Sequence, residues 1–318
     1  MYELYGCNTG PFGTAFGESN ALNILDTFCL PACLNQQVGQ QGVPFQFYSP
    51  QYTALYAWSS IGSSSYHALQ VVLRSRQMRG LQFDINYSFA HSIDIGSDAE
   101  RVGTFGGLSA IINTWAPQQL KGSSDFDTRH NVNSNWVFEL PVGKGKRYGS
   151  SWGRLTDAFL GGWQLAGVWR WSSGFPFSIG NGGTFPTNFQ LSGTVFTNGV
   201  IPPTGKTYVN GVPNVFKSSD PGALTQDFRY AYPGESGQRN NFRGDGFFGI
   251  DMGLSKIFAI TERQNVKLSW ETFNITNSNR FDVQSISVDI QNPASFGQYN
   301  APTLTQPRVM QFALRYSF

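Results

Sequence analysis

Met310-Gln311-Phe312-Ala313-Leu314-Arg315-Tyr316-Ser317-Phe318 is a stretch in which apolar residues alternate with polar or small ones without a break. In a β-strand, such alternation places large apolar side chains on a single face, here Met310, Phe312, Leu314, Tyr316 and Phe318. On a soluble edge strand that face would promote aggregation, whereas a strand that borders lipid requires it. The stretch therefore predicts a strand of a membrane-spanning β-barrel.

Six other segments repeat this alternation with a period of two residues. Each is close to the ~9–11 residues with which a tilted strand crosses a bilayer. Lys256 is an exception, because it falls among the apolar residues of its segment. With the first stretch, these segments predict an all-β fold of about seven long, antiparallel, up-and-down strands, the others being 67–74, 81–89, 131–140, 163–172, 248–258 and 266–271.

The composition agrees with a transmembrane barrel. Charged residues make up 13% of the 318 residues and aromatic residues 15%, with 36 glycines and 27 phenylalanines, an unusual balance for a soluble domain. The mean hydropathy is only −0.26 because alternate strand residues and the loops are polar. A net charge of +2 without a basic stripe predicts no nucleic-acid partner.

The second face of these strands carries Gln, Asn, Asp, Ser, Gly and single charges, instead of the Lys, Glu and Thr usual on a soluble sandwich. This mixture is typical of the wet lumen of a barrel. Several aromatic residues near strand ends fit an interfacial girdle: Tyr66, Tyr87, Trp163, Trp171, Tyr316 and Phe318. We expect substrate contacts from the loop 173–245 and from five lumen-facing residues, Arg170, Asp251, Lys267, Glu271 and Arg315.

The connections between the predicted strands differ in length in a regular way. Long ones cover 92–129, 173–245 and 276–307, and they alternate with shorter ones over 77–80, 141–159 and 259–264. Barrels of this class have long extracellular loops and short periplasmic turns. With the C-terminus in the periplasm, every long connection falls outside the cell. Only 141–159 is longer than a turn requires, and it contains the basic run Gly143-Lys144-Gly145-Lys146-Arg147.

The N-terminal region, which begins Met1-Tyr2-Glu3-Leu4, has neither the basic nor the apolar part of a secretory signal. An exported protein needs such a signal, so we expect a mature segment or the C-terminal part of a longer protein. Cys29 and Cys33 could close a small disulfide loop, or they and Cys7 could be unpaired loop cysteines.

Several sequence blocks, in order from about 65 to 318, resemble the Oar-like TonB-dependent outer-membrane transporters of Acidobacteria. Each block is weak alone, but their order together with the aromatic terminus is fairly specific. The blocks are Tyr66-His67-Ala68-Leu69-Gln70-Val71, Arg79-Gly80-Leu81-Gln82-Phe83, Tyr87-Ser88-Phe89-Ala90-His91-Ser92-Ile93-Asp94, Phe126-Asp127-Thr128-Arg129-His130, Glu139-Leu140-Pro141-Val142-Gly143-Lys144-Gly145-Lys146, Gly161-Gly162-Trp163-Gln164-Leu165, Ser173-Gly174-Phe175-Pro176-Phe177 and Glu271-Thr272-Phe273-Asn274-Ile275-Thr276-Asn277.

This resemblance implies a location in the bacterial outer membrane and substrate uptake across it. It implies that residues 65–318 are the C-terminal part of a barrel of about 22 strands, and that 1–64 belong to the extracellular loop of the preceding hairpin. The plug, which would contact the TonB energy-coupling protein, and the other strands would lie elsewhere in the protein. Further partners would be outer-membrane lipid and the barrel-assembly machinery, which would read the terminal apolar residues Phe312, Leu314, Tyr316 and Phe318.

Catalytic and metal sites receive little support from the sequence. Asp125, Asp127, Arg129 and His130 cluster at the start of one strand, which we interpret as a salt-bridged strand end. Asp282, Asp289 and Asn292 lack the spacing of a calcium loop. We expect no enzymatic activity, no metal and no cofactor.

Two other functions are compatible with the same residues. One is a structural or adhesive outer-membrane barrel that displays its loops. The other is a secreted β-sandwich that binds carbohydrate, suggested by the abundance of Trp and Tyr. A plug domain upstream would favour the transporter, whereas solubility without detergent would favour the sandwich.

Overall fold

A computed structural model describes residues 60–97, 116–181, 194–198, 200, 203–230, 235–301 and 303–318. The three cysteines and most of the predicted N-terminal loop region 1–64 lie outside these residues. Within the described part of the chain, no helix is both long and apolar enough to span a membrane.

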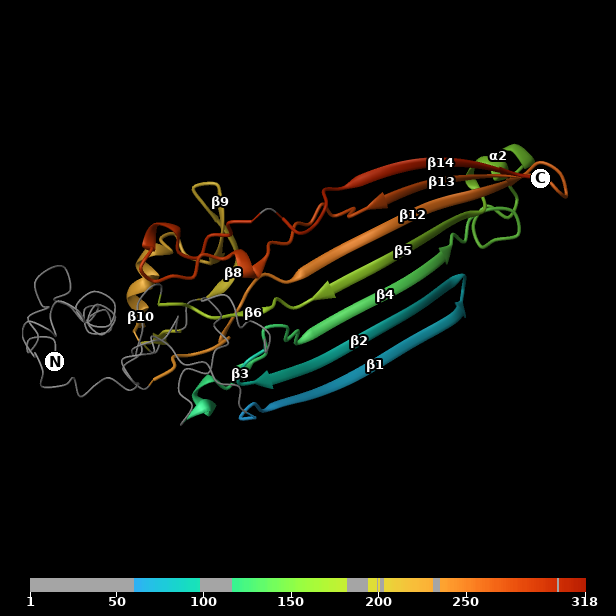
Figure 1. The fold of residues 1–318 in the computed structure, drawn as a ribbon. Helices are drawn as coiled ribbons and strands as arrows, with labels where there is room; N and C mark the ends of the chain where they lie inside the picture. Colours follow the sequence, from blue (N-terminus) through green and yellow to red (C-terminus); the bar gives the residue numbers. More distant parts are fainter. Residues whose placement is uncertain are drawn as a thin grey trace, which may run out of the picture.

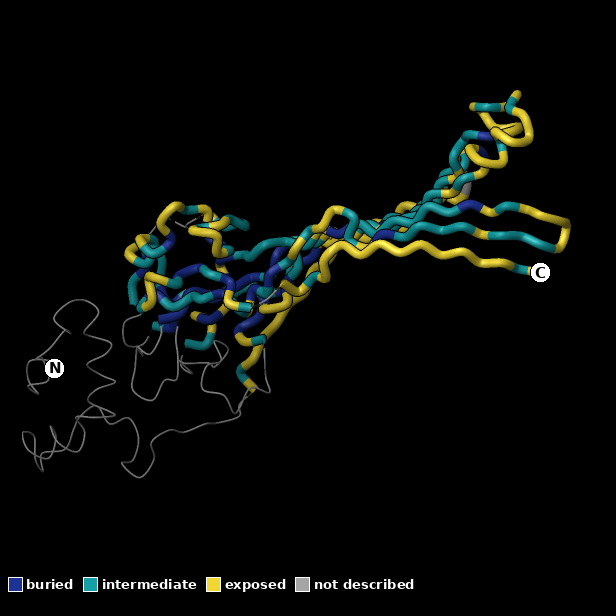
Figure 2. The backbone as a smooth tube through the Cα atoms, turned by 90° about the horizontal axis from the view of Figure 1, so that it is seen from above, coloured by how far each residue is buried: buried dark blue, intermediate teal, exposed yellow. Residues whose placement is uncertain are grey.

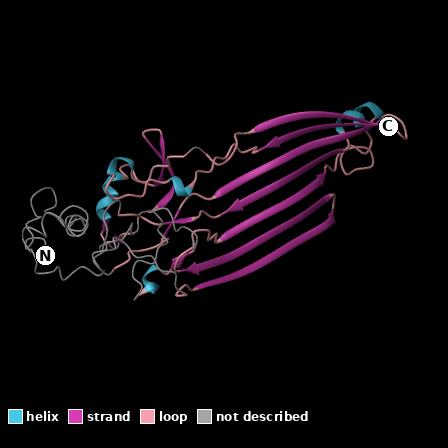
Figure 3. Cartoon of the chain, in the orientation of Figure 1, coloured by secondary structure: helices cyan, strands magenta, loops and turns pink. Residues whose placement is uncertain are grey.

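Seven long strands form one antiparallel sheet in which each strand neighbours the next in sequence (Figures 1 and 3). This confirms the seven predicted strands and their up-and-down order. The two-residue strand β3 (Gly122–Ser123) extends the sheet beside β2. The long strands are β1 (Ser64–Met78), β2 (Leu81–Asp94), β4 (His130–Glu139), β5 (Trp163–Ser172), β12 (Phe247–Ala259), β13 (Asn265–Phe273) and β14 (Val309–Ser317).

The pairing register brings like residues together on each face. Leu254 of β12 lies opposite Leu165 and Trp270, whereas its neighbour Ser255 lies opposite Gln164 and Ser269. Many side chains of the apolar face are exposed, including Leu69, Leu73, Phe248, Phe312 and Leu314. The described sheet is a single layer with no second sheet packed on this face (Figures 1 and 2). The sandwich alternative is therefore wrong, because a sandwich buries one face of each sheet against the other.

Short connections lie at one end of the sheet. Between β1 and β2, Arg79 and Gly80 have φ angles of 53° and 88°, the left-handed conformation that a two-residue hairpin turn requires. Between β12 and β13, Ile260 donates its amide to the carbonyl of Gln264. The third connection contains the helix α2 (Arg154–Leu160), and the C-terminus lies at the same end (Figure 1).

The described parts of the long connections lie at the opposite end, where they form a cap with its own apolar core (Figure 1). Phe216 and Phe296 are almost completely buried there, with stacked rings whose centroids are 5.1 Å apart. The loop 173–245, from which we expect substrate contacts, contributes four of its phenylalanines to this core: Phe177, Phe216, Phe228 and Phe242.

The cap continues the β5–β12 hairpin beyond the sheet. Strands β6 (Pro176–Phe177) and β11 (Phe242–Arg243) pair directly above that hairpin. A Cβ on Gly174 would collide with the carbonyl oxygen of Gly244, so the close approach of these two segments requires glycine. The other cap elements are η3 (Pro117–Leu120), β7 (Phe196–Thr197), β8 (Thr204–Val209), β9 (Val212–Phe216), η4 (Gly222–Asp227), β10 (Phe228–Arg229), η5 (Val283–Ser285) and η6 (Pro293–Ser295).

Candidate functional site

The five residues expected to face a lumen share the polar face of the sheet. In the register, Lys267 lies opposite Arg315, Glu271 opposite Gln311, and Arg170 opposite Gly249, two residues before Asp251. The alternation in the sequence therefore placed all five on the correct face. Their contact with a substrate stays a prediction.

Charged side chains on this face pair with one another across neighbouring strands. Arg170 Nη2 lies 2.6 Å from Asp251 Oδ2, and Arg74 Nε lies 2.7 Å from Asp84 Oδ2. Gln311 Nε2 donates to Glu271 Oε2 at 2.5 Å. Such half-exposed pairs contribute about 0–1 kcal/mol each to stability, so a ligand could replace one partner at little cost.

A hollow of about 580 Å³ lies along the middle of the sheet and includes three of these carboxylates. Asp84, Asp251 and Glu271 line it together with Asn135. The same hollow also includes Arg76 and apolar side chains such as Trp136 and Val168, and the three carboxylates are already paired on the sheet, so the lining does not select one class of ligand.

Two arginines lie close to one aromatic ring where the polar face meets the cap. The guanidinium carbon of Arg170 is 5.9 Å from the centre of the Phe247 ring, and that of Arg280 is 6.0 Å from the same centre. Arg280 also lies 4.7 Å from the Phe175 ring. No pattern in the sequence indicated Arg280, because it lies far from Phe175 in sequence and only the folded cap brings the two together.

Asn274, within the sequence block Glu271–Asn277, joins β13 to the cap. Its φ angle is 51°, a left-handed conformation that asparagine tolerates. Its amide donates to Asp251 Oδ1 at 2.8 Å, and its Nδ2 donates to the carbonyls of Ser278 and Gln306, each at 2.9 Å. The residue therefore fixes the direction in which the chain leaves the sheet beside the Arg170–Asp251 pair.

The cluster Asp125, Asp127, Arg129 and His130 divides between two environments. His130 points to the apolar face, where its Nδ1 shares a 2.9 Å hydrogen bond with the Tyr87 hydroxyl. Asp125, Asp127 and Arg129 instead join a polar network under the cap. The interpretation as a salt-bridged strand end therefore holds for Asp125, Asp127 and Arg129. It is wrong for His130, because strand residues alternate in direction and His130 is the first residue of β4.

Two cap arginines complete that network, which we call the rim network. Arg239 donates from Nη1 to Asp94 Oδ1 at 2.5 Å and from Nη2 to Asp125 Oδ1 at 2.9 Å. Arg243 pairs with Asp127 and also donates to the carbonyl of Gly174 at 3.2 Å. The side chain of Arg239 is only 1% exposed. The rim network therefore fastens the cap to the ends of β2 and β4.

Asp127 is held ionised in this network. Burial by itself would raise the pKa of its carboxyl group, but the amide of Ser92, Arg243 and Arg129 donate hydrogen bonds and lower that pKa below its ordinary value. The Ser92 amide lies 2.7 Å from Asp127 Oδ1, and Arg129 Nε lies 3.1 Å from Oδ2. A charged Asp127 is thus part of the folded cap at neutral pH.

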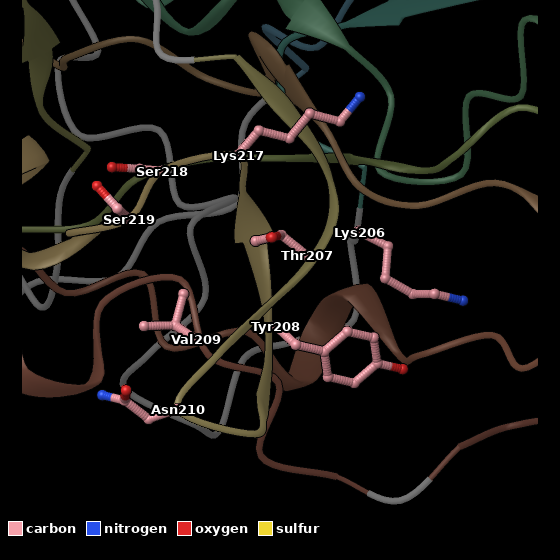
Figure 4. Close-up of a pocket in the computed structure, with 8 residues that line it drawn as sticks. All are labelled: Lys206, Thr207, Tyr208, Val209, Asn210, Lys217, Ser218 and Ser219. Carbon is pink, nitrogen blue, oxygen red and sulfur yellow. The ribbon is translucent and has the colours of Figure 1, made fainter.

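Outer parts of the cap carry a second, open hollow of about 640 Å³ around the β8–β9 hairpin (Figure 4). Lys206 and Lys217 line it together with Tyr208, Ser218 and Ser219. Lys206 Nζ is already engaged, because it donates to Asn279 Oδ1 at 2.9 Å and lies 3.7 Å from Asp245 Oδ2.

Acidic residues of the connection between β13 and β14 serve turns. Asp282 Oδ1 accepts the amide of Gln284, and Asp289 Oδ2 accepts the side-chain amide of Asn292. Among the residues that the structure describes, no group of three or more His, Cys, Asp or Glu residues is arranged to hold a metal ion.

On β14 and the residue that follows it, the predicted assembly residues Phe312, Leu314, Tyr316 and Phe318 are exposed, and residues Phe312 and Phe318 are 76% and 94% accessible. Phe312 stacks on Trp270 of β13 with ring centroids 6.3 Å apart. They therefore form a continuous apolar surface at this edge of the sheet, and recognition by the assembly machinery stays a prediction.

Comparison with protein families agrees with this architecture. The family model described as "Outer membrane beta barrel domain" matches residues 9–311. Comparisons with the curated proteins and with the solved structures gave no match. The match covers most of the chain, and the sheet has the apolar face, polar face and alternating connections of such a barrel. The chain therefore belongs to the outer membrane β-barrel domain family, and its location is the bacterial outer membrane.

Proposed function

We propose that this barrel domain is part of a TonB-dependent transporter of the Oar-like type. Support for this proposal comes mainly from the paired charges on the polar face, since they give the wall of a barrel a hydrated surface along which a polar solute could move. The Phe247 ring with Arg170 and Arg280 would be the first group that a solute meets after passing the cap.

The proposal includes partners. The remaining strands, up to about 22 in such a barrel, and a plug would be supplied by other parts of the protein, and TonB would act through the plug. Outer-membrane lipid would cover the apolar face. The barrel-assembly machinery would recognise β14 through its apolar residues.

Uptake by intact cells tests transport. We would measure the uptake of labelled cobalamin, ferric siderophores and malto-oligosaccharides by cells with and without the gene. Each measurement would be made with and without a protonophore. We expect uptake of at least one of these probes to fall at least tenfold when the gene is deleted. The same fall should follow addition of the protonophore, because TonB action depends on the inner-membrane proton gradient. Gene-dependent uptake that persists with the protonophore would indicate a passive pore.

Loop display is the second candidate function. The structure of the cap favours display, because the phenylalanines of the cap form a separate apolar core, which a stable displayed domain requires. Unchanged uptake of every probe in the deletion strain, together with loss of adhesion to surfaces, would support display and contradict transport.

Orientation in the membrane can be tested separately. The cap lies at the end of the sheet opposite the C-terminus, so a cysteine in place of the exposed Tyr208 should react with a membrane-impermeant maleimide on intact cells. A cysteine in place of Gly145, where an added Cβ would meet no other atom although the φ angle of 77° makes the exchange strained, should react only after the outer membrane is permeabilised. The opposite pattern would invert the proposed orientation.

A further inference from the structure

The connection between β4 and β5 is unusual because it is folded and yet buries almost no apolar side chain. Residues 140–162 contain α2, in which no residue is buried. Leu155 and Phe159, four residues apart and so on one side of the helix, are 78% and 69% exposed, and Leu160 is 55% exposed. Short helices in water depend on packing of an apolar face, and this face packs on nothing in the described residues.

This segment is attached to the apolar face of the sheet. Lys256, the one charged residue of β12 on that face, donates from Nζ to the carbonyls of Gly161 and Asp157, the latter at 3.2 Å. Trp163 Nε1 donates to the carbonyl of Phe159 at 2.9 Å. Figure 2 shows the segment standing off one side of the sheet at the end that carries the C-terminus. The exposed side of α2 therefore continues the surface that faces lipid.

The helix also has a defined orientation. Asp157 points back to the turn before the helix, where its Oδ1 accepts the amide of Lys144 at 2.5 Å. A Cβ on Gly143 would come within 2.9 Å of the Gly161 Cα, so the turn and the helix end are in close contact. With Asp157 directed inward, Leu155 and Phe159 must point outward, since they lie on the opposite side of the helix.

The charges of this segment match a phospholipid surface. It carries four basic residues, Lys144, Lys146, Arg147 and Arg154, and one acidic residue, Asp157. Lys146 Nζ also pairs with Glu139 Oε2 of β4 at 3.2 Å, so the other three are the main candidates for headgroup contact. Tyr148 is exposed and Trp152 is half-exposed, the two residue types that favour the headgroup region. Basic and apolar residues together on a surface helix are typical of binding to anionic membrane interfaces.

We propose that residues 141–162 form an interfacial anchor, in which Leu155 and Phe159 insert among the lipids and the basic residues bind anionic phospholipid headgroups. The occupant of this surface is thus the membrane itself, in the leaflet at the turn end of the barrel. Lys256 satisfies carbonyls at the end of α2 and so connects the anchor to the barrel wall. The inference rests on the membrane location of the barrel and not on transport.

Depth-dependent fluorescence quenching tests the anchor. The full-length protein with its native cysteines replaced by serine would carry Phe159→Cys labelled with the fluorophore NBD, in vesicles of phosphatidylethanolamine and phosphatidylglycerol. We expect blue-shifted emission and at least threefold quenching by lipids with a doxyl group near the headgroup. Leu314→Cys on the lipid face is the positive control, and Tyr208→Cys in the cap is the negative control.

If the probe at position 159 has water-like emission and is not quenched while the probe at position 314 is, the anchor does not exist. Replacing phosphatidylglycerol with phosphatidylcholine should reduce quenching at position 159 at least twofold. The combined change Lys144→Gln, Lys146→Gln, Arg147→Gln and Arg154→Gln should remove this dependence on lipid charge. Equal quenching at position 159 in both lipid mixtures would show that anionic headgroups do not contribute to binding. Protection of position 159 from water in cells but not in vesicles would indicate a protein partner instead.

Discussion

Leu254→Arg should lower the free energy of unfolding of the membrane-inserted protein by about 2–4 kcal/mol, the cost of an arginine near the bilayer midplane of a barrel. Leu254 lies near the middle of β12 on the apolar face, opposite Leu165 and Trp270. Leu268 is a poorer choice for this test, because it lies opposite Lys256, near the turn end. The measurement is urea unfolding in vesicles, followed by tryptophan fluorescence.

Ser255→Arg is the matched control, one residue away on the polar face. Because the lumen is hydrated, this change should cost less than about 1 kcal/mol. If the two variants lost the same stability, both faces of the sheet would be packed in similar surroundings, and the assignment of one face to lipid would be wrong.

Arg239→Ala should destabilise the cap by about 3–5 kcal/mol, because it leaves the buried Asp94 carboxylate without its partner. The Arg239 and Asp94 side chains are 1% and 7% exposed, and their atoms lie 2.5 Å apart. Opening of the cap can be measured by amide hydrogen exchange. We also expect proteinase K to cleave the variant within 173–246 while the strands stay protected.

Two further variants separate the buried pair from other effects. Asp94→Ala combined with Arg239→Ala should recover part of the lost stability, since no unpaired charge remains. Glu235→Gln removes the half-exposed partner of Arg229, at 2.8 Å, and should cost less than about 1 kcal/mol. Equal effects of Arg239→Ala and Glu235→Gln would show that the rim network does not hold the cap.

Several features of the site escaped sequence analysis for one physical reason. Arg239 and Arg243 each lie more than a hundred residues from the aspartates with which they pair, Asp94, Asp125 and Asp127, so no local spacing relates them. The only local sign was the dense polar run around Phe242, which contains both arginines and Asn240. Loops lack a fixed period, and therefore their partners cannot be inferred from alternation.

The sequence by itself determined the seven long strands, their order and the face to which each residue belongs. Strand residues alternate with a period of two, so the pattern of a run such as Met310–Phe318 shows which of its side chains share a face. It also determined that the long connections share one end, because antiparallel neighbours joined in sequence must turn at alternate ends.

Only the tertiary structure decided what the connections become. Burial of phenylalanines from separate loops produced the cap, and ion pairs distant in sequence fastened it to β2 and β4. Tertiary contacts likewise explained Lys256, an exception to the apolar pattern, through its bonds to the end of α2. Such contacts depend on distances between segments far apart in the chain, and the residue pattern within a segment does not contain them.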